Sequence, residues 1–556
     1  MVGHVNMMDD VLISQLPASI LRSSLRAMIS QGLAAQATFV EHVRRRLKES
    51  PPPYIPADEL FSGESPRHAE YLVLTRCLFS SKLASESLPY FTHFLRSVPQ
   101  ANANWNPDDP LEHSLQTACG DMVQAVQALK ESRPVLTDEH REDLIQLYSA
   151  LDECETYCGT KQLSYPFHRA RRQVEDLLSL QFPDFSPRPT SGLCKNVTKP
   201  TVTIDPRHFN RLEYTMLGSV RVPRLINGLW QLSSPAWGSA SSEKQCAALG
   251  QLVEAGLVAA DMADHYGDAE LIFGSFRNNL TMDIRESIVV ATKWCVFRPL
   301  GKTINTELVR DAVMERWKRI GGRIELLQFH WYNYADKEYL NVLLELVKFA
   351  ENQPHIVKEI GLCNFDSKHT EEACSFLLSK LGRVGIVSNQ IQFSLIDCRP
   401  LVHMTAVCQK YDIKLLTYGS FCGGFLADKW LGRHAPDIYF ETPQLTPSQR
   451  KYFDMISTWG NWEDFQALLR SLKQIADKYG VDTSNIATRW VLDHPEVGAV
   501  IVGTRLGVSS NVDSNLRTFS FKLDAEDLRQ LEMHHLGKRA KEVFEKIGDC
   551  GHEYQK

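Results

Sequence analysis

The amino-acid sequence predicts an α/β protein, a (β/α)8 TIM barrel preceded by an all-α N-terminal domain. Two changes of pattern along the chain support this prediction. Apolar residues recur at helical spacing through the first third, and beyond a stretch rich in Pro, Ser and Thr the chain alternates short apolar runs with helical segments. Such alternation is typical of parallel strands that are joined by helices.

The N-terminal domain is predicted to span residues 1–182. Residues 21–50, 109–132 and 137–158 place apolar side chains three and four positions apart, as amphipathic helices do. We find no fixed-period repeat among them. We expect a packing or oligomerisation module, through which the protein would bind a protein partner or associate with itself. Residues 183–207, where Pro, Ser and Thr are frequent, are interpreted as a linker.

The barrel domain is predicted to cover residues 208–540. Eight short apolar runs in it have the composition of strands that are buried on both faces. They cover residues 224–232, 257–264, 287–294, 323–331, 359–365, 385–393, 413–420 and 497–505. Eight runs favour a closed barrel over an open doubly wound sheet, and no G-x-G-x-x-G turn follows any of them.

Two segments fall outside this alternation. The interval between the seventh and eighth runs is too long for one helix, so residues 424–465 are interpreted as an insertion. An insertion in a barrel commonly forms a lid or a wall of the substrate pocket. Residues 541–556 are interpreted as a C-terminal tail.

The composition narrows the classes of function. The 556 residues carry a formal net charge of −6, so nucleic acid is not expected as a partner. We find no apolar run long enough for a membrane span and no secretory signal. The 13 cysteines are scattered without a pairing pattern, which indicates reduced thiols. We therefore expect a cytoplasmic protein with no membrane partner.

The candidate catalytic residues lie at the carboxyl ends of predicted strands, where a barrel places its active site. Asp261 ends the second apolar run, and Tyr266 follows it in the stretch DMADHYGDAE. Lys293 lies at the end of the third run and His330 at the end of the fourth. Each residue alone has an ordinary explanation, such as a helix cap for Asp261. Four of them at successive strand ends favour a functional site.

These residue types suit general acid catalysis. A free Tyr has a pKa of about 10, which a nearby Lys ammonium would lower. A buried Lys needs a carboxylate partner, which Asp261 would supply, and His330 would bind a substrate oxygen. Such a set protonates an alkoxide as a carbonyl accepts hydride. No metal is expected, because Lys293 would repel a cation held by Asp261, Asp264 and His265.

The stretch DMADHYGDAELIFG resembles the Asp-x-Ala-x-x-Tyr-Gly-x-x-Glu signature of the aldo-keto reductases. Six further motifs follow in the order that the family has them: ATKW, LLQFHW, EIGLCNF, VSNQIQF, LLTYGSFCGGFL and VIVGTR. The resemblance covers residues 209–536. Within the family, the stretches INGLWQLSS and SLIDCRP are most similar to a branch that contains a flagellar radial spoke protein and uncharacterised microbial and plant reductases.

The resemblance implies NADPH-dependent reduction of an aldehyde or ketone. It makes Tyr266 the proton donor, Lys293 and Asp261 the residues that tune its pKa, and His330 the residue that orients the carbonyl. The residues implied at the nicotinamide end of the cofactor are Tyr418, Asn364, Gln390, Gly228, Leu229 and Trp230. Those implied along the pyrophosphate are Gly419, Ser420, Phe421 and Gly423, and those at the adenosine half are Thr504, Arg505, Asn511 and Asn515.

Two features depart from the family pattern. Cys363 stands where the family commonly has Ser, and a thiol is the weaker donor, so cofactor binding would lose roughly 0.5–1.5 kcal/mol. The terminal motif GTRLGVSSNVDSN carries extra residues before Asn515. Arg505 is the expected ligand of the cofactor 2′-phosphate, because Arg can make bidentate contacts with phosphate.

The sequence therefore predicts an enzyme that acts on a small-molecule carbonyl substrate. Two alternatives stay open: a scaffold protein that retains the barrel, and a regulatory subunit that senses NADPH. The helical domain keeps both alternatives open, since a reductase does not require it, whereas the complete set of four residues favours the enzyme. Four tryptophans suggest an aromatic pocket for planar or apolar carbonyls: Trp230, Trp237, Trp294 and Trp331.

Overall fold

A closed barrel of eight parallel strands forms the second part of the chain, which confirms the predicted fold class. The structure is a computed structural model that describes residues 13–30, 32–62, 65–107, 109–132, 135–187, 202–203, 211–439 and 445–555. The barrel strands are β3 (Leu225–Gly228), β4 (Ala259–Asp261), β5 (Val289–Cys295), β6 (Ile324–His330), β7 (Val357–Cys363), β8 (Ser388–Gln392), β9 (Lys414–Tyr418) and β10 (Val497–Gly503). They pair in the order β10-β3-β4-β5-β6-β7-β8-β9. Each strand overlaps one of the eight apolar runs.

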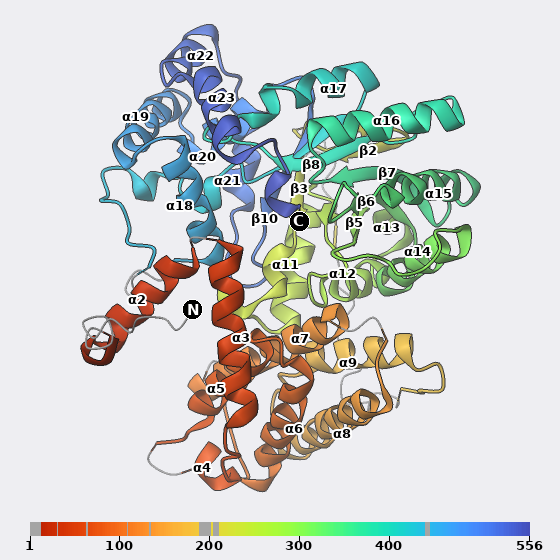
Figure 1. Cartoon of the computed structure of the whole chain (residues 1–556), viewed down its shortest axis with the longest axis vertical. Helices are drawn as coiled ribbons and strands as arrows, with labels where there is room; N and C mark the ends of the chain where they lie inside the picture. The colour runs from red at the N-terminus through yellow and green to blue at the C-terminus, as the bar shows by residue number, and fades with distance from the viewer. Residues whose placement is uncertain are drawn as a thin grey trace, which may run out of the picture.

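Helices surround the barrel (Figure 1). Those between β3 and β9 are α11 (Ser242–Glu254), α12 (Ala269–Asn278), α13 (Met282–Ser287), α14 (Thr306–Ile320), α15 (Glu338–Asn352), α16 (Ser367–Leu381) and α17 (Met404–Tyr411). Those after β9 are α18 (Pro447–Trp459), α19 (Trp462–Tyr479), α20 (Thr483–Leu492), α21 (Val512–Arg517), α22 (Ala525–Glu532) and α23 (Leu536–Ile547). Short 3-10 turns are η2 (Trp230–Ser233), η3 (Pro235–Trp237), η4 (Arg399–Leu401), η5 (Cys422–Gly424), η6 (Asp428–Trp430) and η7 (His552–Tyr554).

Local sequence signals set the ends of several of these helices. The Asn305 side chain accepts a hydrogen bond from the backbone of Leu308 at the start of α14, and Gly321 ends the helix at a φ of 67°. The Asp366 side chain caps α16 in the same way, and Gly382 ends it at a φ of 73°. Asn and Asp are favoured at helix starts, and Gly is favoured where the backbone becomes left-handed.

A β-hairpin closes the amino-terminal end of the barrel. Its strands β1 (Tyr214–Leu217) and β2 (Val220–Pro223) pair antiparallel. Leu217, Val220 and Val222 pack in one buried cluster with barrel residues that include Ile226 and Leu416. This end of the barrel is therefore filled by apolar side chains, and the polar side chains of the strands gather at the opposite end.

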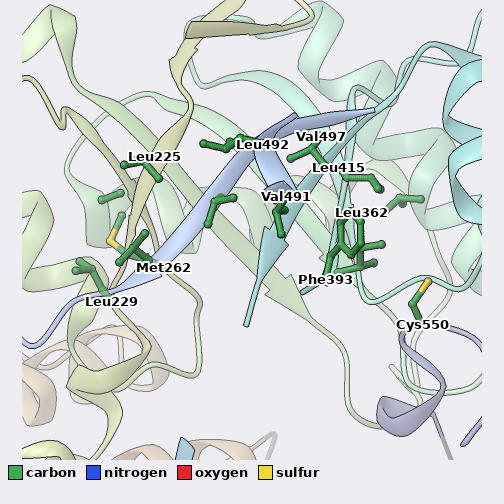
Figure 2. Packing of buried hydrophobic residues seen from close by; sticks show 14 of the residues in the cluster. Leu225, Leu229, Met262, Leu362, Phe393, Leu415, Val491, Leu492, Val497 and Cys550 are labelled. Carbon is green, nitrogen blue, oxygen red and sulfur yellow. The ribbon is translucent and has the colours of Figure 1, made fainter. Parts of the chain in front are cut away.

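The main hydrophobic core lies between the strands and the outer helices. Figure 2 shows part of it, with Leu415 of β9 near Val491 of α20 and Leu225 of β3 toward the left of the view. Cys550, which follows α23, belongs to the same cluster and lies at its edge in this view. Residues 541–556, predicted as a tail, therefore include part of α23 and a segment that packs against the barrel.

The N-terminal region consists of helices with a hydrophobic core of their own. They are α2 (Ala18–Ile29), α3 (Leu33–Glu49), α4 (Ala57–Phe61), α5 (His68–Ser80), α6 (Ala84–Gln100), α7 (Pro110–Ser132), α8 (Asp138–Lys161) and α9 (His168–Gln181). In Figure 1, α7 and α9 lie next to α11 and α12 of the barrel. Most of the predicted linker lies outside the described residues. Among the helices of the described ranges, none is long and apolar enough to cross a membrane.

Candidate active site

Four ionisable side chains lie together at the carboxyl ends of neighbouring barrel strands. Asp261 ends β4, Lys293 lies near the end of β5 and His330 ends β6. Tyr266 follows in the loop between β4 and α12. The parallel register places Asp261 beside Ala291, two residues before Lys293, so the strand ends meet at one rim. The structure therefore brings together the four residues that the sequence singled out.

Lys293 and Asp261 form a buried ion pair. The Lys293 ammonium lies 2.6 Å from Asp261 Oδ2 and donates to the carbonyl oxygen of Met262 at 2.8 Å. Gln328 and Gln390 donate to the other carboxylate oxygen, at 2.8 and 2.7 Å. Burial alone would lower the pKa of Lys293, but the Asp261 carboxylate raises it above its ordinary value. The lysine is therefore charged at neutral pH.

Tyr266 lies beside this ion pair, with the Lys293 ammonium 4.9 Å from the centroid of its ring. Burial raises the pKa of the Tyr266 phenol above its ordinary value, Lys293 offsets only part of this effect, and the Asp261 charge adds to it. Lys293 therefore lowers the pKa of Tyr266, as expected, but the net shift of this pKa is upward. The reason is that removal of the phenol from water outweighs the nearby cation. The phenol keeps its proton at neutral pH.

His330 is a buried, neutral imidazole. Burial, with a smaller contribution from His265, lowers its pKa to about 4. Neither of its ring nitrogens has a hydrogen-bond partner among the described residues. The rings of Phe297 and Tyr554 have centroids 5.4 and 6.4 Å from that of His330. A neutral imidazole offers one N–H donor and one acceptor, so this site can bind a polar group from outside the chain.

The loop that carries Tyr266 also holds a group of possible metal ligands. Asp264, His265 and Cys295 place one ligand atom each within 4.8 Å of one another, and no other such group is found in the described ranges. Asp264 is bound by the guanidinium of Arg316 and by the backbone N–H of Cys295, the latter at 3.1 Å. A guanidinium on the carboxylate opposes a cation there. This group of residues therefore does not fit a metal site.

The residues implied for the nicotinamide end lie on the adjoining part of the rim. Tyr418 ends β9, and its hydroxyl donates to Asn364 Oδ1 at 2.9 Å. Asn364 follows β7 in a left-handed conformation with a φ of 59°, and its backbone N–H donates to the carbonyl oxygen of Gln390 at 2.8 Å. The Gln390 side chain donates to Asp261, so it links this corner to the ion pair.

Cys363, which departs from the family pattern, ends β7 and is buried. Burial raises the pKa of its thiol to about 12, although Lys293 lowers it in part. The thiol is therefore neutral and is only a weak hydrogen-bond donor beside Asn364.

Gly228, Leu229 and Trp230 lie beside the end of β4. A Cβ at Gly228 would come within 2.8 Å of Ile501 Cγ2, so this position has no room for a side chain. The backbone N–H of Leu229 donates to the carbonyl oxygen of Asp261 at 3.0 Å. Trp230 is partly exposed, 4.7 Å from the ring of Trp237.

The segment after β9 makes a tight turn that packs against α18. Gly419 and Gly423 have φ values of 78° and 63°, and a side chain at Gly419 would clash with Tyr452. The Ser420 hydroxyl donates to the carbonyl oxygen of Phe393 at 3.1 Å. Phe421, also implied at the pyrophosphate, is half-buried in this turn. Glycines in a turn of this kind let a ligand approach the backbone.

The residues implied for the adenosine half follow β10. The Thr504 backbone N–H donates to the carbonyl oxygen of Gly228 at 2.9 Å, which joins this segment to the nicotinamide end. Arg505 is exposed and donates to the Ser509 hydroxyl at 3.1 Å. Asn511 precedes α21, and the backbone N–H of Asn515 donates to its carbonyl oxygen at 2.8 Å. An exposed guanidinium at one end and an aromatic ring with amides at the other fit a phosphorylated dinucleotide.

Tyr554 is a residue of this site that the sequence did not indicate. Its hydroxyl lies 3.3 Å from that of Tyr418 and accepts a hydrogen bond from Lys451 of α18 at 2.5 Å. The segment before it is anchored by Arg399, a fully buried residue that contacts Glu553 at 3.1 Å. No local pattern in the sequence indicated Tyr554, because the buried Arg399 also has an acidic partner two positions before it, Asp397 at 2.7 Å.

The barrel part of the chain is similar to known proteins. The model of the aldo/keto reductase family matches residues 224–535, more than half of the chain. The flagellar radial spoke protein 5 of Chlamydomonas reinhardtii is 30% identical over 186 residues, which cover 31% of this chain and 33% of that protein. The aldo-keto reductase YhdN of Bacillus subtilis (strain 168) is 22% identical over 307 residues, or 53% of this chain and 85% of that protein.

Two further matches are reductases by name. The methylglyoxal reductase DkgA of Escherichia coli (strain K12) is 22% identical over 320 residues, which cover 57% of this chain and 91% of that protein. A solved structure of a thermostable aldo-keto reductase with the inhibitor epalrestat has a TM-score of 0.44 and 20% identity, and the match covers 58% of this chain and 100% of that chain. The protein partner expected for the helical region finds no support in these comparisons.

The fold is that of a (β/α)8 barrel whose rim carries four ionisable side chains. The match over residues 224–535 shows that the chain belongs to the aldo/keto reductase family. Membership of this family implies NAD(P)H-dependent carbonyl reduction.

Proposed function

We propose that the protein is an NADPH-dependent carbonyl reductase in which Tyr266 is the proton donor. One arrangement carries this proposal: a neutral Tyr266 phenol lies beside a charged Lys293 that Asp261 holds in place. The unpartnered imidazole of His330 lies at the same rim. Donors that are fixed in place stabilise the charge that develops on a carbonyl oxygen during reduction.

Each of these residues has one role in the proposed reaction. When bound, NADPH supplies hydride to the carbonyl carbon. Tyr266 gives its proton to the substrate oxygen as negative charge develops there, and the Lys293 ammonium stabilises the phenolate that remains. His330, neutral at physiological pH, donates its N–H to the same oxygen and orients the carbonyl. Asp261 keeps Lys293 charged and in position.

The cofactor would lie across the rim from β7 to β10. In this proposal Tyr418, Asn364 and Gln390 hold the nicotinamide end with the turn that contains Gly228, Leu229 and Trp230. The turn that contains Gly419, Ser420, Phe421 and Gly423 lies along the pyrophosphate. Arg505 binds the 2′-phosphate, and Thr504, Asn511 and Asn515 contact the adenosine half.

The substrate would be a small carbonyl compound. The rings of Phe297 and Tyr554 beside His330 favour a planar or apolar one. The name of the E. coli relative makes methylglyoxal the other compound to test first. The experiment is to titrate the protein with NADPH and NADH while following tryptophan fluorescence, and then to measure cofactor oxidation with methylglyoxal and aromatic aldehydes.

We expect NADPH to bind in the micromolar range and at least one carbonyl to be reduced. Binding of NADPH without turnover of any carbonyl would support the sensor alternative. If neither dinucleotide binds, the scaffold alternative would replace the proposed function.

A further inference from the structure

The helical region contacts the loop that carries Tyr266. Arg169 of α9 makes three hydrogen bonds to the carboxylate of Asp268, from Nη2 to Oδ1 at 2.7 Å and from Nε to Oδ1 and Oδ2 at 3.2 and 3.1 Å. The same guanidinium donates to the carbonyl oxygen of Leu232 in η2 at 3.0 Å. Arg169 therefore joins α9 to two segments of the catalytic rim.

This ion pair is shielded from solvent. Arg169 is 9% exposed, and Asp268 is fully buried. Charges in such a place interact more strongly than they do in water, and either one would be costly to leave without its partner. The pair therefore fixes the distance between the helical region and the loop.

Asp268 is the residue before helix α12, where an Asp side chain ordinarily caps the helix. An Asp at such a position commonly accepts a hydrogen bond from the first turn of the helix. Here its side chain makes no capping hydrogen bond and contacts Arg169 instead. The Asp268 side chain therefore links the start of α12 to Arg169 of the helical region, instead of capping α12.

Helix α7 supports the same loop on both sides of Tyr266. Before it, the Gln127 side chain donates to the carbonyl oxygen of Asp264 at 3.4 Å. After it, Val123 packs so closely on Gly267 that a Cβ there would come within 2.9 Å of Val123 Cγ1. In Figure 1, α7 and α9 lie directly against the side of the barrel that contains α11 and α12.

The barrel also holds the loop, through helix α14. Arg316 of α14 binds the carboxylate of Asp264. Arg319 of the same helix donates to the carbonyl oxygen of Gly267 at 3.0 Å, and its guanidinium also lies 3.5 Å from Asp176 of α9. The loop is therefore held by α14 and by the helical region, and Arg319 contacts both the loop and α9.

We propose that the helical region positions the catalytic loop, and that Arg169 is the positioning residue through which it does so. This inference rests on the proposed function of Tyr266. Proton transfer requires the phenol to lie at hydrogen-bond distance from the substrate oxygen, and a displacement of about 1 Å can slow a reaction about 100-fold. The helical region thus acts on the chemical step without contacting the substrate.

The test compares Arg169→Ala with Arg171→Ala in the full-length chain. Arg171 is a matched control, because it lies on the same helix, is buried and forms ion pairs with Asp152, Glu155 and Glu175 inside the helical region. Both variants lose a buried guanidinium, but only Arg169→Ala releases Asp268. The measurements are kcat, the dissociation constant of NADPH, and deuterium exchange of the backbone amides of residues 262–268.

We expect Arg169→Ala to lower kcat by about 10- to 100-fold and to change NADPH affinity by less than about threefold. Amides of residues 262–268 should exchange faster in this variant and at the wild-type rate in Arg171→Ala. Arg169→Lys, which retains the charge but not the two-point contact, should give an intermediate loss of kcat. If Arg169→Ala does not fold, Asp268→Asn serves as the second variant, because it removes the charge at nearly constant volume.

Three results would overturn the inference. These are a kcat of Arg169→Ala close to that of the wild type, an equal loss of kcat in Arg171→Ala, or unchanged exchange of residues 262–268 in Arg169→Ala. Failure of the proposed function gives a different pattern: the wild type would then reduce no carbonyl, while the exchange measurement would still report whether Arg169 holds the loop.

Discussion

The ammonium of Lys293 lies 4.9 Å from the centroid of the Tyr266 ring, yet the pKa of Tyr266 is raised. Burial of the phenol has the larger effect, and the Asp261 carboxylate beside Lys293 adds to it. Tyr266 is therefore neutral before the reaction, as a proton donor must be. In the proposed mechanism the Lys293 charge becomes important after the transfer, when the phenolate needs a cation beside it.

Lys293→Met should lower both the free energy of unfolding and turnover. The substitution leaves the Asp261 carboxylate buried without its cation, which costs about 3–5 kcal/mol. Denaturant unfolding and steady-state kinetics on the same preparation measure the two effects.

The double variant Lys293→Met/Asp261→Asn is the control. It removes the unpaired charge and should regain part of the stability without regaining turnover. Recovery of turnover in the double variant would mean that Lys293 has a structural role only.

His330 should make the free energy of unfolding fall as the pH falls from neutral toward pH 4. Its pKa is about 4 in the folded protein, against about 6.5 in an unfolded chain. Between these two pKa values the unfolded state binds more protons than the folded state. The stabilisation that the neutral His330 gives the folded state is therefore fully present above the unfolded pKa, and it is lost as the pH falls toward the folded pKa. At pH 5 the loss should be about 2 kcal/mol.

Denaturant unfolding at pH 7.5 and about pH 5 measures this loss in the wild type and in His330→Gln, which has no group that titrates there. The wild type should lose about 2 kcal/mol more than the variant over this interval. An equal loss in both proteins would show that His330 does not titrate as its burial indicates.

Arg505→Ala should weaken the binding of NADPH much more than that of NADH. The exposed Arg505 guanidinium is the proposed ligand of the 2′-phosphate, which NADH lacks. A fluorescence titration with each cofactor measures the two affinities. The neighbouring exposed residue Arg517, which pairs with Asp482, provides the control variant Arg517→Ala. Equal weakening of both cofactors by Arg505→Ala would assign the 2′-phosphate to another residue.

Tyr554→Ala should raise the KM for aromatic carbonyls by several-fold and leave kcat nearly unchanged. The ring of Tyr554 lies 6.4 Å from that of His330 and would form one wall of the substrate pocket. Tyr554→Phe, which keeps the ring but loses the contact with Lys451, should retain the KM of the wild type. A similar rise in KM in both variants would mean that the hydroxyl, rather than the ring, is required.

The positions of the barrel strands could be predicted because strands buried on both faces are continuous apolar runs. The meeting of Asp261, Lys293 and His330 followed from the same pattern, since parallel strands of a barrel end at one rim. The pKa of Tyr266 was not predictable, because it depends on how completely the folded chain removes the phenol from water.

Contacts between segments that lie far apart in the sequence could not be predicted from local sequence patterns either. Tyr418 and Tyr554 are 136 positions apart, and Arg169 and Asp268 are 99 apart. Periodicity describes how one segment presents its apolar side, and it does not identify the polar partner that a side chain meets after folding.

The central claim is that Tyr266 is the general acid, and the steady-state turnover of Tyr266→Phe tests it most directly. The variant keeps the ring and its packing and removes the transferable proton. General acid catalysis contributes about 10²–10⁴-fold, so kcat should fall by that factor while NADPH affinity changes by less than about threefold. His265→Ala, which alters the adjacent residue, should retain far more activity. Near-normal turnover of Tyr266→Phe on a good substrate would contradict the assignment of the acid to this residue.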